Sequence, residues 1–373
     1  MSEQRALINA ILERPDDDLP RLVYADYLDE TGDADRAEFI RVQLQLAKLD
    51  HGDERVADLS RREHELLQIG FGGYVPGVRG IQTFRRGFVE SLDTTAERLI
   101  QAPKTLLLLA PIRELRIRNA DNALDDLAKV PGLDRIESLD LRNNSFGTQD
   151  RVARFFDAAP LRSMSRLNLA NNQLWSDNVE RLVGCRWAPQ LRSLDLSGNA
   201  IGDTGATVLA RAESLRGLNT LILRSEGLDW RDRIQTSGAR TLGLSQTLNE
   251  LRNFDISGHL IGTEGLAYLV EFDLLPALES VDASANRIEF DTVSVANQAY
   301  LRAKRDRMRI WNLSSSSISL LAAEAFTTWP QLETLDRLIL EQCDWEPGAR
   351  EVLAASPWAH KIRMGNPASG EQA

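Results

Sequence analysis

The decisive stretch of the chain is LRSLDLSGNAI, residues Leu191 to Ile201. Leu194 and Leu196 alternate with Asp195, so two apolar side chains lie on one face of a short strand. One strand cannot bury that face by itself. The pattern therefore predicts a unit that must be stacked on further copies of itself.

The same spacing recurs through most of the chain. Ile136 to Phe146 and Met164 to Leu174 are nearly perfect copies. Looser copies begin at Ile112, Leu218, Leu251, Leu278, Met308 and Leu335. The nine starts are 24, 28, 27, 27, 33, 27, 30 and 27 residues apart, and a period of this size is typical of a solenoid.

Each unit continues beyond its strand with helical spacing, as in Ala206, Leu209 and Ala210. Prolines that would end these helices follow at Pro131, Pro160, Pro189, Pro276, Pro330 and Pro357. We expect parallel strands on the inner side of an arc and helices on its outer side. The Asn at the strand exit should turn inward and bond backbone groups at the bend. His259 and Cys343 take this place in two units and are predicted to be structural.

The Leu-x-x-Leu-x-Leu-x-x-Asn units resemble ribonuclease-inhibitor-type leucine-rich repeats over about residues 112 to 364. The resemblance implies an α/β leucine-rich-repeat horseshoe, a solenoid with a parallel concave sheet and convex helices, preceded by a small α-helical domain. Glu226, His259 and Ser316 stand where Asn is expected, which leaves the bend geometry of those units open.

The N-terminal segment predicts a small helical domain. Residues 3–14, 22–28 and 39–46 have helical apolar spacing. The runs PRLVYADYLD, residues 20–29, and RAEFIR, residues 36–41, resemble the bacterial repeat-companion domain over about residues 5 to 47. That resemblance implies association with repeat proteins and assigns no reaction. Asp16, Asp17 and Asp18 follow Pro15, which favours a helix entry over a cation site.

The expected domains are residues 1–50, the helical repeat-companion domain, and 51–110, a helical connector with an N-terminal cap strand. They continue with 111–366, the solenoid of about nine repeats with a C-terminal cap, and 367–373, a disordered tail. The connector holds a helix near Glu54 to Ile69 and the Gly-rich stretch Gly70 to Gly80. Gly87 to Leu92 predicts an edge strand that covers the open end of the array, and Ile362 with Met364 predicts a half strand at the other end.

Composition excludes several classes of function. The net charge is −11 and the pI is about 5.1, whereas nucleic-acid binding needs a basic surface. Residues 1–70 hold seventeen Asp and Glu against nine Lys and Arg, so 9 − 17 = −8 of the charge lies there. Met1 to Ala10 lacks a signal-peptide pattern, and no apolar run could span a bilayer. With only Cys185 and Cys343, far apart in sequence, we expect a cytoplasmic protein.

The sequence predicts neither catalysis nor a cofactor or metal. His51, His64, His259 and His360 sit in no catalytic motif. The sequence contains no HExxH and no GxSxG motif. The Gly-containing stretch Gly70 to Gly73 is not a phosphate-cradling loop, because no Lys follows it. A site assembled from residues distant in sequence stays open at this point.

Binding is expected on the concave strand face, where Asp recurs at the middle position of several strands. Those Asp residues either solvate the sheet or form a charge-patterned groove for a protein carrying basic residues. The fifth unit is longer by about six residues and contains Trp230, Arg231, Asp232 and Arg233, which form an interface loop or pack beneath it. The candidate partner-binding residues are Arg116, Arg118, Asp140, Arg142, Asp195, Arg224, Trp230, Arg231, Arg233, Asp255 and Asp282.

Taken together, these patterns predict a non-enzymatic protein–protein interaction module, a scaffold or adaptor that binds an unknown protein through its concave face, with no nucleic-acid or membrane partner. Two alternatives stay open. One is a regulator of a small GTPase, since similar repeats include proteins that activate such GTPases. The other is a sensor of peptide or cell-wall fragments.

Overall fold

The computed structural model describes residues 3–50, 52–69, 80–102, 106–147, 151–225, 227–271, 275–290 and 307–365. His51, residues 70–79, Glu226 and the predicted tail 367–373 lie outside this set. The chain forms two compact units. The N-terminal unit comprises residues 1–141 and 158–164, and the repeat unit comprises residues 142–157 and 165–373.

The four helices expected near the start of the N-terminal unit are confirmed as α1 (Glu3–Glu13), α2 (Leu19–Thr31), α3 (Ala34–Leu46) and α4 (Arg55–Gln68). The unit also contains α5 (Ala96–Gln101) and α6 (Leu124–Leu127). The strands are β1 (Ile81–Arg85), β2 (Phe88–Thr95), β3 (Glu114–Arg118) and β4 (Ser138–Asp140). Helices α1 to α3 bury Ile11, Ala25, Ile40 and Leu44 in one core with Phe88 of β2.

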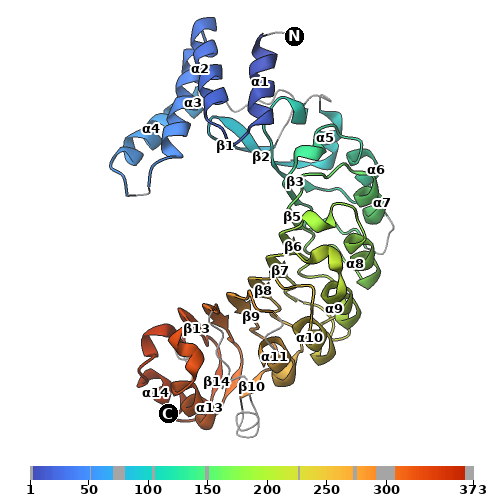
Figure 1. Ribbon diagram of the computed structural model, residues 1–373, viewed down its shortest axis with the longest axis vertical. Helices are drawn as coiled ribbons and strands as arrows, with labels where there is room; N and C mark the ends of the chain where they lie inside the picture. Colours follow the sequence, from blue (N-terminus) through green and yellow to red (C-terminus); the bar gives the residue numbers. More distant parts are fainter. Residues whose placement is uncertain are drawn as a thin grey trace. The chain divides into compact units, whose positions relative to one another are not determined.

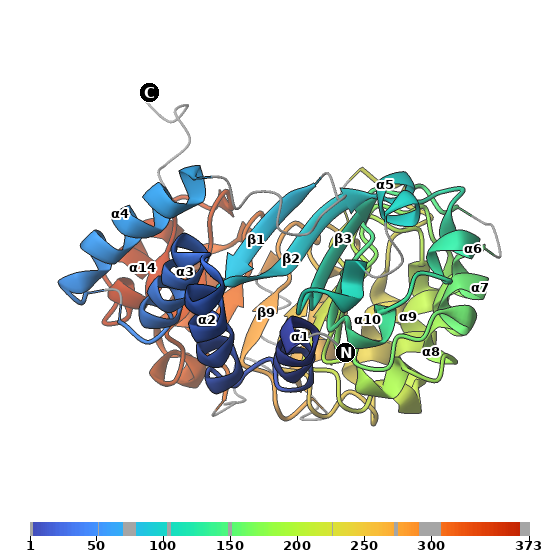
Figure 2. The same ribbon diagram turned by 90° about the horizontal axis from the view of Figure 1, so that it is seen from above.

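The expected edge strand at Gly87 to Leu92 is wrong in one respect. This segment forms β2, but β2 is an interior strand, because β1 pairs with it in antiparallel and β3 in parallel. Figure 2 shows β1, β2 and β3 side by side. Strand β1 was not expected, since it follows the Gly-rich stretch and the turn that joins it to β2 has no Asn-Gly or Asp-Gly signal.

Helix α3 packs against the turn that joins β1 to β2 and forms hydrogen bonds with it. Arg86 and Gly87 occupy the turn with φ of 51° and 87°. Gln43 accepts a 2.6 Å hydrogen bond from the Gly87 amide, and Arg36 donates to the Gly87 carbonyl. A Cβ atom on Gly87 would lie 2.7 Å from the Ile40 side chain. Both the backbone conformation and the space therefore require glycine here.

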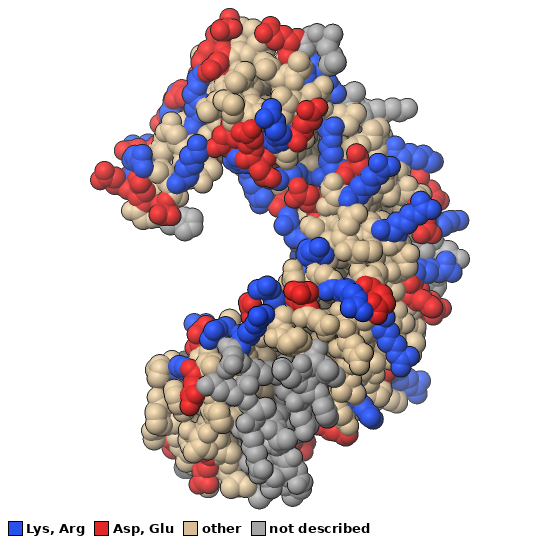
Figure 3. Space-filling view, viewed as in Figure 1, with Lys and Arg blue, Asp and Glu red and all other residues tan. Residues whose placement is uncertain are grey.

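Charges of both signs are interspersed on the face of the molecule that Figure 3 presents. Within residues 1–70, arginines pair with several of the carboxylates that give this segment its negative charge. Arg41 bonds Asp26 at 2.6 Å and Asp29 at 2.7 Å, and Arg62 bonds Glu38 at 2.7 Å. These carboxylates contribute to a partly neutralised helical surface.

A buried ion pair joins α2 to β2. Arg21 and Glu90 have side chains that are 0% and 2% exposed, and the guanidinium lies 2.7 Å from the carboxylate. Arg21 also donates to the carbonyls of Pro15, Arg85 and Arg86. Burial lowers the pKa of Arg21, and the Glu90 carboxylate acts in the opposite direction. Both terminal nitrogens of the guanidinium are bonded, while its Nε has no hydrogen-bond partner among the described residues, so the pairing with Glu90 and these carbonyls is what allows the charge to be buried.

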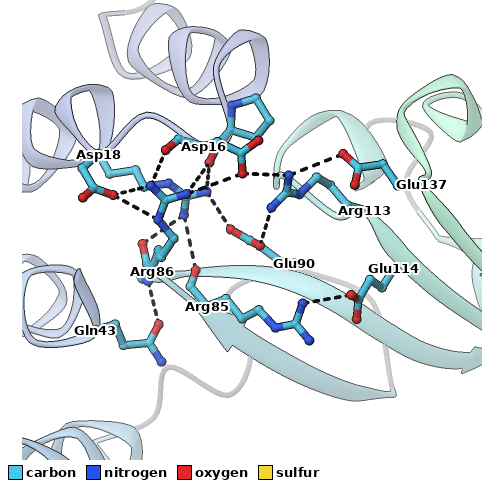
Figure 4. Close-up of polar contacts among 12 residues, drawn as sticks. Asp16, Asp18, Gln43, Arg85, Arg86, Glu90, Arg113, Glu114 and Glu137 are labelled. Atoms are coloured by element: carbon cyan, nitrogen blue, oxygen red, sulfur yellow. Dashed lines mark hydrogen bonds and ion pairs between the residues drawn. The ribbon is translucent and has the colours of Figure 1, made fainter. Parts of the chain in front are cut away.

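The network extends from Glu90 to the predicted helix entry (Figure 4). Arg113 lies 3.2 Å from Glu90 and 3.0 Å from Asp16, and Arg86 pairs with Asp18. Asp17 accepts a 2.9 Å hydrogen bond from the Leu19 amide at the start of α2. The three aspartates therefore start a helix and pair with arginines, as the helix-entry interpretation expects.

The repeat unit contains the remaining helices and strands. Its helices are α7 (Arg151–Ala158), α8 (Ser176–Val183), α9 (Gly202–Arg211), α10 (Thr236–Gly243), α11 (Gly262–Glu271), α13 (Leu320–Thr327) and α14 (Ala349–Ala354). Its main strands are β5 (Arg166–Asn168), β6 (Ser193–Asp195), β7 (Thr220–Ile222), β8 (Asn253–Asp255), β9 (Ser280–Asp282), β11 (Ile310–Asn312), β13 (Arg337–Ile339) and β15 (Ile362–Arg363).

The predicted solenoid is confirmed in this unit. The strands pair in parallel, in chain order and in register, so that Leu194 aligns with Leu167 on one side and Leu221 on the other. These leucines are buried. Figure 1 shows the strands of the unit on its inner side and the helices on its outer side. Short strands β10 (Glu289–Phe290), β12 (Ser317–Ile318) and β14 (Asp344–Trp345) form a second parallel sheet.

The strand-exit Asn side chains point inward and bond the backbone, as predicted. Asn199 accepts from the amides of Asn172 and Leu174 at 3.0 Å. It donates to the carbonyls of Leu169 and Leu196 at 2.9 and 2.8 Å. Each such Asn therefore bonds backbone of its own repeat and of the repeat before it, which replaces the hydrogen bonds that the bend removes.

We predict that Arg21→Ala destabilises the N-terminal unit by about 3 kcal/mol, near the lower end of the cost of breaking a buried pair, because Arg113 still faces Glu90. Hydrogen exchange of the β1–β2 amides measures the change, since all seven tryptophans lie at or beyond residue 175. Arg41→Ala, at a partly exposed pair, serves as the control and should cost about 1 kcal/mol or less. Equal effects of the two substitutions would contradict the importance of the buried pair.

Candidate protein-interaction surfaces

Among the described residues, the histidines and cysteines that could carry catalysis differ in their surroundings. His64 and His360 are exposed, and His259 is buried. Burial raises the pKa of Cys185 to about 12, and it also raises the pKa of Cys343, so neither thiol is activated. In the described part of the chain, no three His, Cys, Asp or Glu side chains gather as a metal site. No described helix is long and apolar enough to cross a bilayer.

In the N-terminal unit, the predicted residues form an ion ladder across the strands. Arg118 pairs with Asp93 at 2.8 Å. Arg116 lies 3.6 Å from Asp93 and 3.8 Å from Asp140. Asp93 is a member of this ladder that the sequence analysis did not name. The two arginines and two aspartates of this ladder therefore balance one another within the unit.

In the repeat unit, the predicted Asp residues are held by internal hydrogen bonds. One oxygen of Asp195 accepts from the amide and hydroxyl of Ser197 at 2.9 and 2.6 Å. The other oxygen accepts from Asn168 of the neighbouring strand at 3.0 Å. Asp255 and Asp282 bond Ser257 and Ser284 in the same way. The Asp row therefore fixes the strand exits.

Arginines flank this row. Arg224 is exposed and donates to Asp255 at 3.0 Å, and the Asp255 side chain is only 15% exposed. Arg142 is also exposed. The strand face of the repeat unit thus presents small polar groups whose positions are fixed by their neighbours. Its acidic oxygens are partly shielded.

The inserted loop of the fifth repeat is exposed. Trp230 is 57% exposed, so it does not pack beneath the loop. The Arg231 guanidinium lies 5.3 Å from the centre of the Trp230 ring. Arg233 donates to the Leu228 carbonyl at 3.1 Å and closes the loop on itself. The interpretation that placed Trp230 in a packed position is therefore wrong, and the exposed alternative agrees with the structure.

Beside this loop lies a hollow of about 290 Å³. It is lined by Trp175, Ser176, Ala200, Ile201, Gly202, Asp203, Thr204, Arg231, Asp232, Arg233 and Gln235. These residues come from the strand-to-helix connections of three successive repeats. Trp175, which is 47% exposed, was missed by the sequence analysis. A Trp directly after the last apolar position of a repeat is the signal that could have identified it.

His259 anchors the base of the inserted loop. Its Nδ1 accepts from the Ile234 amide at 3.0 Å and its Nε2 donates to the Leu223 carbonyl at 2.5 Å. A neutral imidazole therefore replaces the bonds of Asn to the preceding repeat. Burial lowers the pKa of His259 to about 4. The charge of Arg233 acts in the same direction, whereas the Leu223 bond, Asp255 and Asp203 oppose it.

Comparison with known proteins identifies the repeat. A family model described as "Leucine Rich repeat" matches residues 189–210. The chain is 32% identical over 181 residues to the transforming growth factor beta activator LRRC33 of Danio rerio. This alignment covers 46% of this chain and 25% of that protein. It is 36% identical over 121 residues to human Toll-like receptor 9, covering 32% of this chain and 10% of the receptor. The chain thus spans a quarter or less of these relatives.

Among solved structures, the yeast complex of Rad7 and Elc1 matches with a TM-score of 0.42 and 13% identity, covering 94% of this chain and 96% of that chain. The stacked parallel strands and their buried leucine rows define a leucine-rich-repeat solenoid fold, and the family model matches one of its repeats. The ribonuclease-inhibitor type and the repeat-companion domain remain predictions.

We predict that His259 makes the stability of the repeat unit depend on pH. Because its folded pKa of about 4 lies below the ordinary value of 6.5, the stabilisation is complete above about pH 6.5. It is lost as the pH falls towards 4, by up to about 1.4 kcal/mol per pH unit. His259→Asn, which restores the usual residue, should remove this slope. Urea unfolding followed by tryptophan fluorescence measures it, and parallel pH profiles for both proteins would rule the explanation out.

Proposed function

We propose that this protein is a non-enzymatic interaction module, a scaffold or adaptor that binds a partner protein through the strand face of its repeat unit. The observation that carries the proposal is the row of Asp–Ser hydrogen bonds, which fixes the polar side chains of that face. A surface that is rigid before binding loses little conformational entropy on association. A specific interface needs roughly 800 Å² per partner, which would extend over several successive strands.

The chemistry of the face favours a protein that carries basic residues. Asp195, Asp255 and Asp282 form its acidic row, and Arg224 alternates with them and would set the register of the partner. In the N-terminal unit, Arg116, Arg118 and Asp140 would add a second charge pattern. The proposal includes a cytoplasmic location, without nucleic acid or membrane as a partner. This agrees with the acidic pI.

The test is to block the strand face while leaving the hydrogen bonds of the Asp row intact. Asn253 and Ser280 pair across β8 and β9, two residues before Asp255 and Asp282 of the Asp row. We predict that Asn253→Arg with Ser280→Arg reduces retention of the native partner at least about tenfold, the scale of a lost hot spot. Quantitative affinity capture from the native cell, with the tagged full chain as bait, measures retention.

Glu264→Arg, exposed on α11, is the matched control because it adds the same side chain away from the strands. Reversing Asp195 or Asp255 would be a poor test, since these residues accept structural hydrogen bonds. If the folded double variant retained every captured protein as the wild type does, the strand face would not be the binding surface.

A further inference from the structure

The hollow at the strand-to-helix connections is separate from the strand face and has its own chemistry. We propose that it docks a segment of a partner protein in which an acidic side chain stands next to a large apolar one. The inference rests on the proposed function only in requiring a protein partner. It concerns Trp175, Trp230, Arg231 and Arg233, which lie outside the Asp row.

Trp175 lines the hollow, and Trp230 stands next to it, with its ring 5.3 Å from the guanidinium of the lining residue Arg231. Trp175 and Trp230 are 47% and 57% exposed. Trp230 belongs to the inserted loop, whereas Trp175 lies in the third repeat, outside that loop. Tryptophan and arginine are the residue types most enriched where binding energy concentrates, and a large aromatic side chain left in water is the costlier choice for a purely structural role.

The charged part favours an anion. Arg231 and Arg233 line the hollow, and neither forms an ion pair with any residue that the structure describes. Asp203 also lines it, but its carboxylate accepts from the amides of Gln235 and Gly238 and from the Ser237 hydroxyl. Asp232 is the other carboxylate of the lining. The lining thus holds two positive and two negative charges, but both oxygens of Asp203 already accept hydrogen bonds, which leaves the Arg231 and Arg233 guanidinium groups facing one carboxylate without such bonds among the described residues, Asp232.

Helix α9 adds to the positive potential. Its first residues, Gly202 to Thr204, line the hollow. Ile201 stands at the N-cap position and provides no side-chain acceptor. The N-terminal end of the helix dipole therefore acts on the hollow together with the two arginines.

The loop is held in place before any ligand binds. The Ile234 amide is bonded by His259, the Gln235 amide is bonded by Asp203, and Arg233 bonds Leu228. The volume of about 290 Å³ lies just below the range for small-molecule pockets, roughly 300 to 1,000 Å³. This size and openness favour one large side chain of a protein segment over a whole small-molecule ligand.

An array of synthetic 12-residue peptides tests the inference. In one set, Asp or Glu adjoins Trp, Phe or Leu. Two matched sets carry Asn or Gln, and Lys or Arg, at the acidic position. The fluorescently labelled full chain is the probe, and the best peptides are then titrated in solution. We expect the acidic set to bind preferentially, and Trp230→Ala to weaken its binding about tenfold.

Arg231→Glu should shift the preference to the Lys and Arg set, because it reverses the charge beside the Trp230 ring. Leu321→Ala, at an exposed apolar side chain of α13, is the matched control and should bind as the wild type does. Unchanged melting temperatures establish that the variants fold. Equal binding of the acidic and amide sets, or wild-type binding by Trp230→Ala, would overturn the inference.

The strand-face variant separates this inference from the proposed function. Asn253→Arg with Ser280→Arg should leave binding of the acidic peptides intact. If the native partner is lost from that variant while no acidic peptide binds the wild type, the proposed function holds and the hollow is not a docking site. If acidic peptides bind at the hollow and the partner is retained by the strand-face variant, the inference holds and the strand-face proposal is wrong.

Discussion

The leucines of each repeat lie on one face of its strand, and the residues of that repeat alone cannot cover them. Parallel pairing in register solves this problem, because Leu167, Leu194 and Leu221 then share one interior. The bend after each strand follows from the same constraint and leaves backbone groups to be bonded, which Asn172 and Asn199 do from within. The Asp–Ser bonds fix the opposite surface of the strands. A polar face of defined geometry is therefore a by-product of burying leucine.

The first strands of the array meet a different requirement, since they have no preceding repeat. In the N-terminal unit, the β1–β2 hairpin precedes β3 in the sheet, and the helices grip the hairpin through Arg21, Arg36 and Gln43. Arg36 is enclosed by Phe39, Phe84 and Phe88, with ring centres 5.3 to 5.8 Å from its guanidinium. A buried ion pair adds little net stability in general, but its many directional bonds fix the arrangement of helices and hairpin.

The period of the leucines was sufficient to predict the solenoid, because a repeated spacing fixes strand, bend and neighbour at once. Features that depend on contacts between residues far apart in the sequence could not be predicted from this spacing. Arg21 and Glu90 are 69 residues apart, and nothing near either one identifies the other. Strand β1 has no turn signal of its own. The exposure of Trp175 and the engagement of the Asp row likewise depend on neighbouring repeats, so sequence spacing could name Trp230 and Asp195 but could not describe their surroundings.

The grip of α3 on Gly87 has a consequence for how such chains recombine. The helices and the hairpin are matched at single atoms, since Ile40 leaves no room for a methyl group and Gln43 bonds the turn amide. Recombination at a point between the helices and the β1–β2 hairpin would combine helices with a hairpin whose turn does not fit them. Gene fusions that transfer these helices to another array must therefore carry the hairpin with them, and the inherited module ends after Thr95 instead of before Ile81.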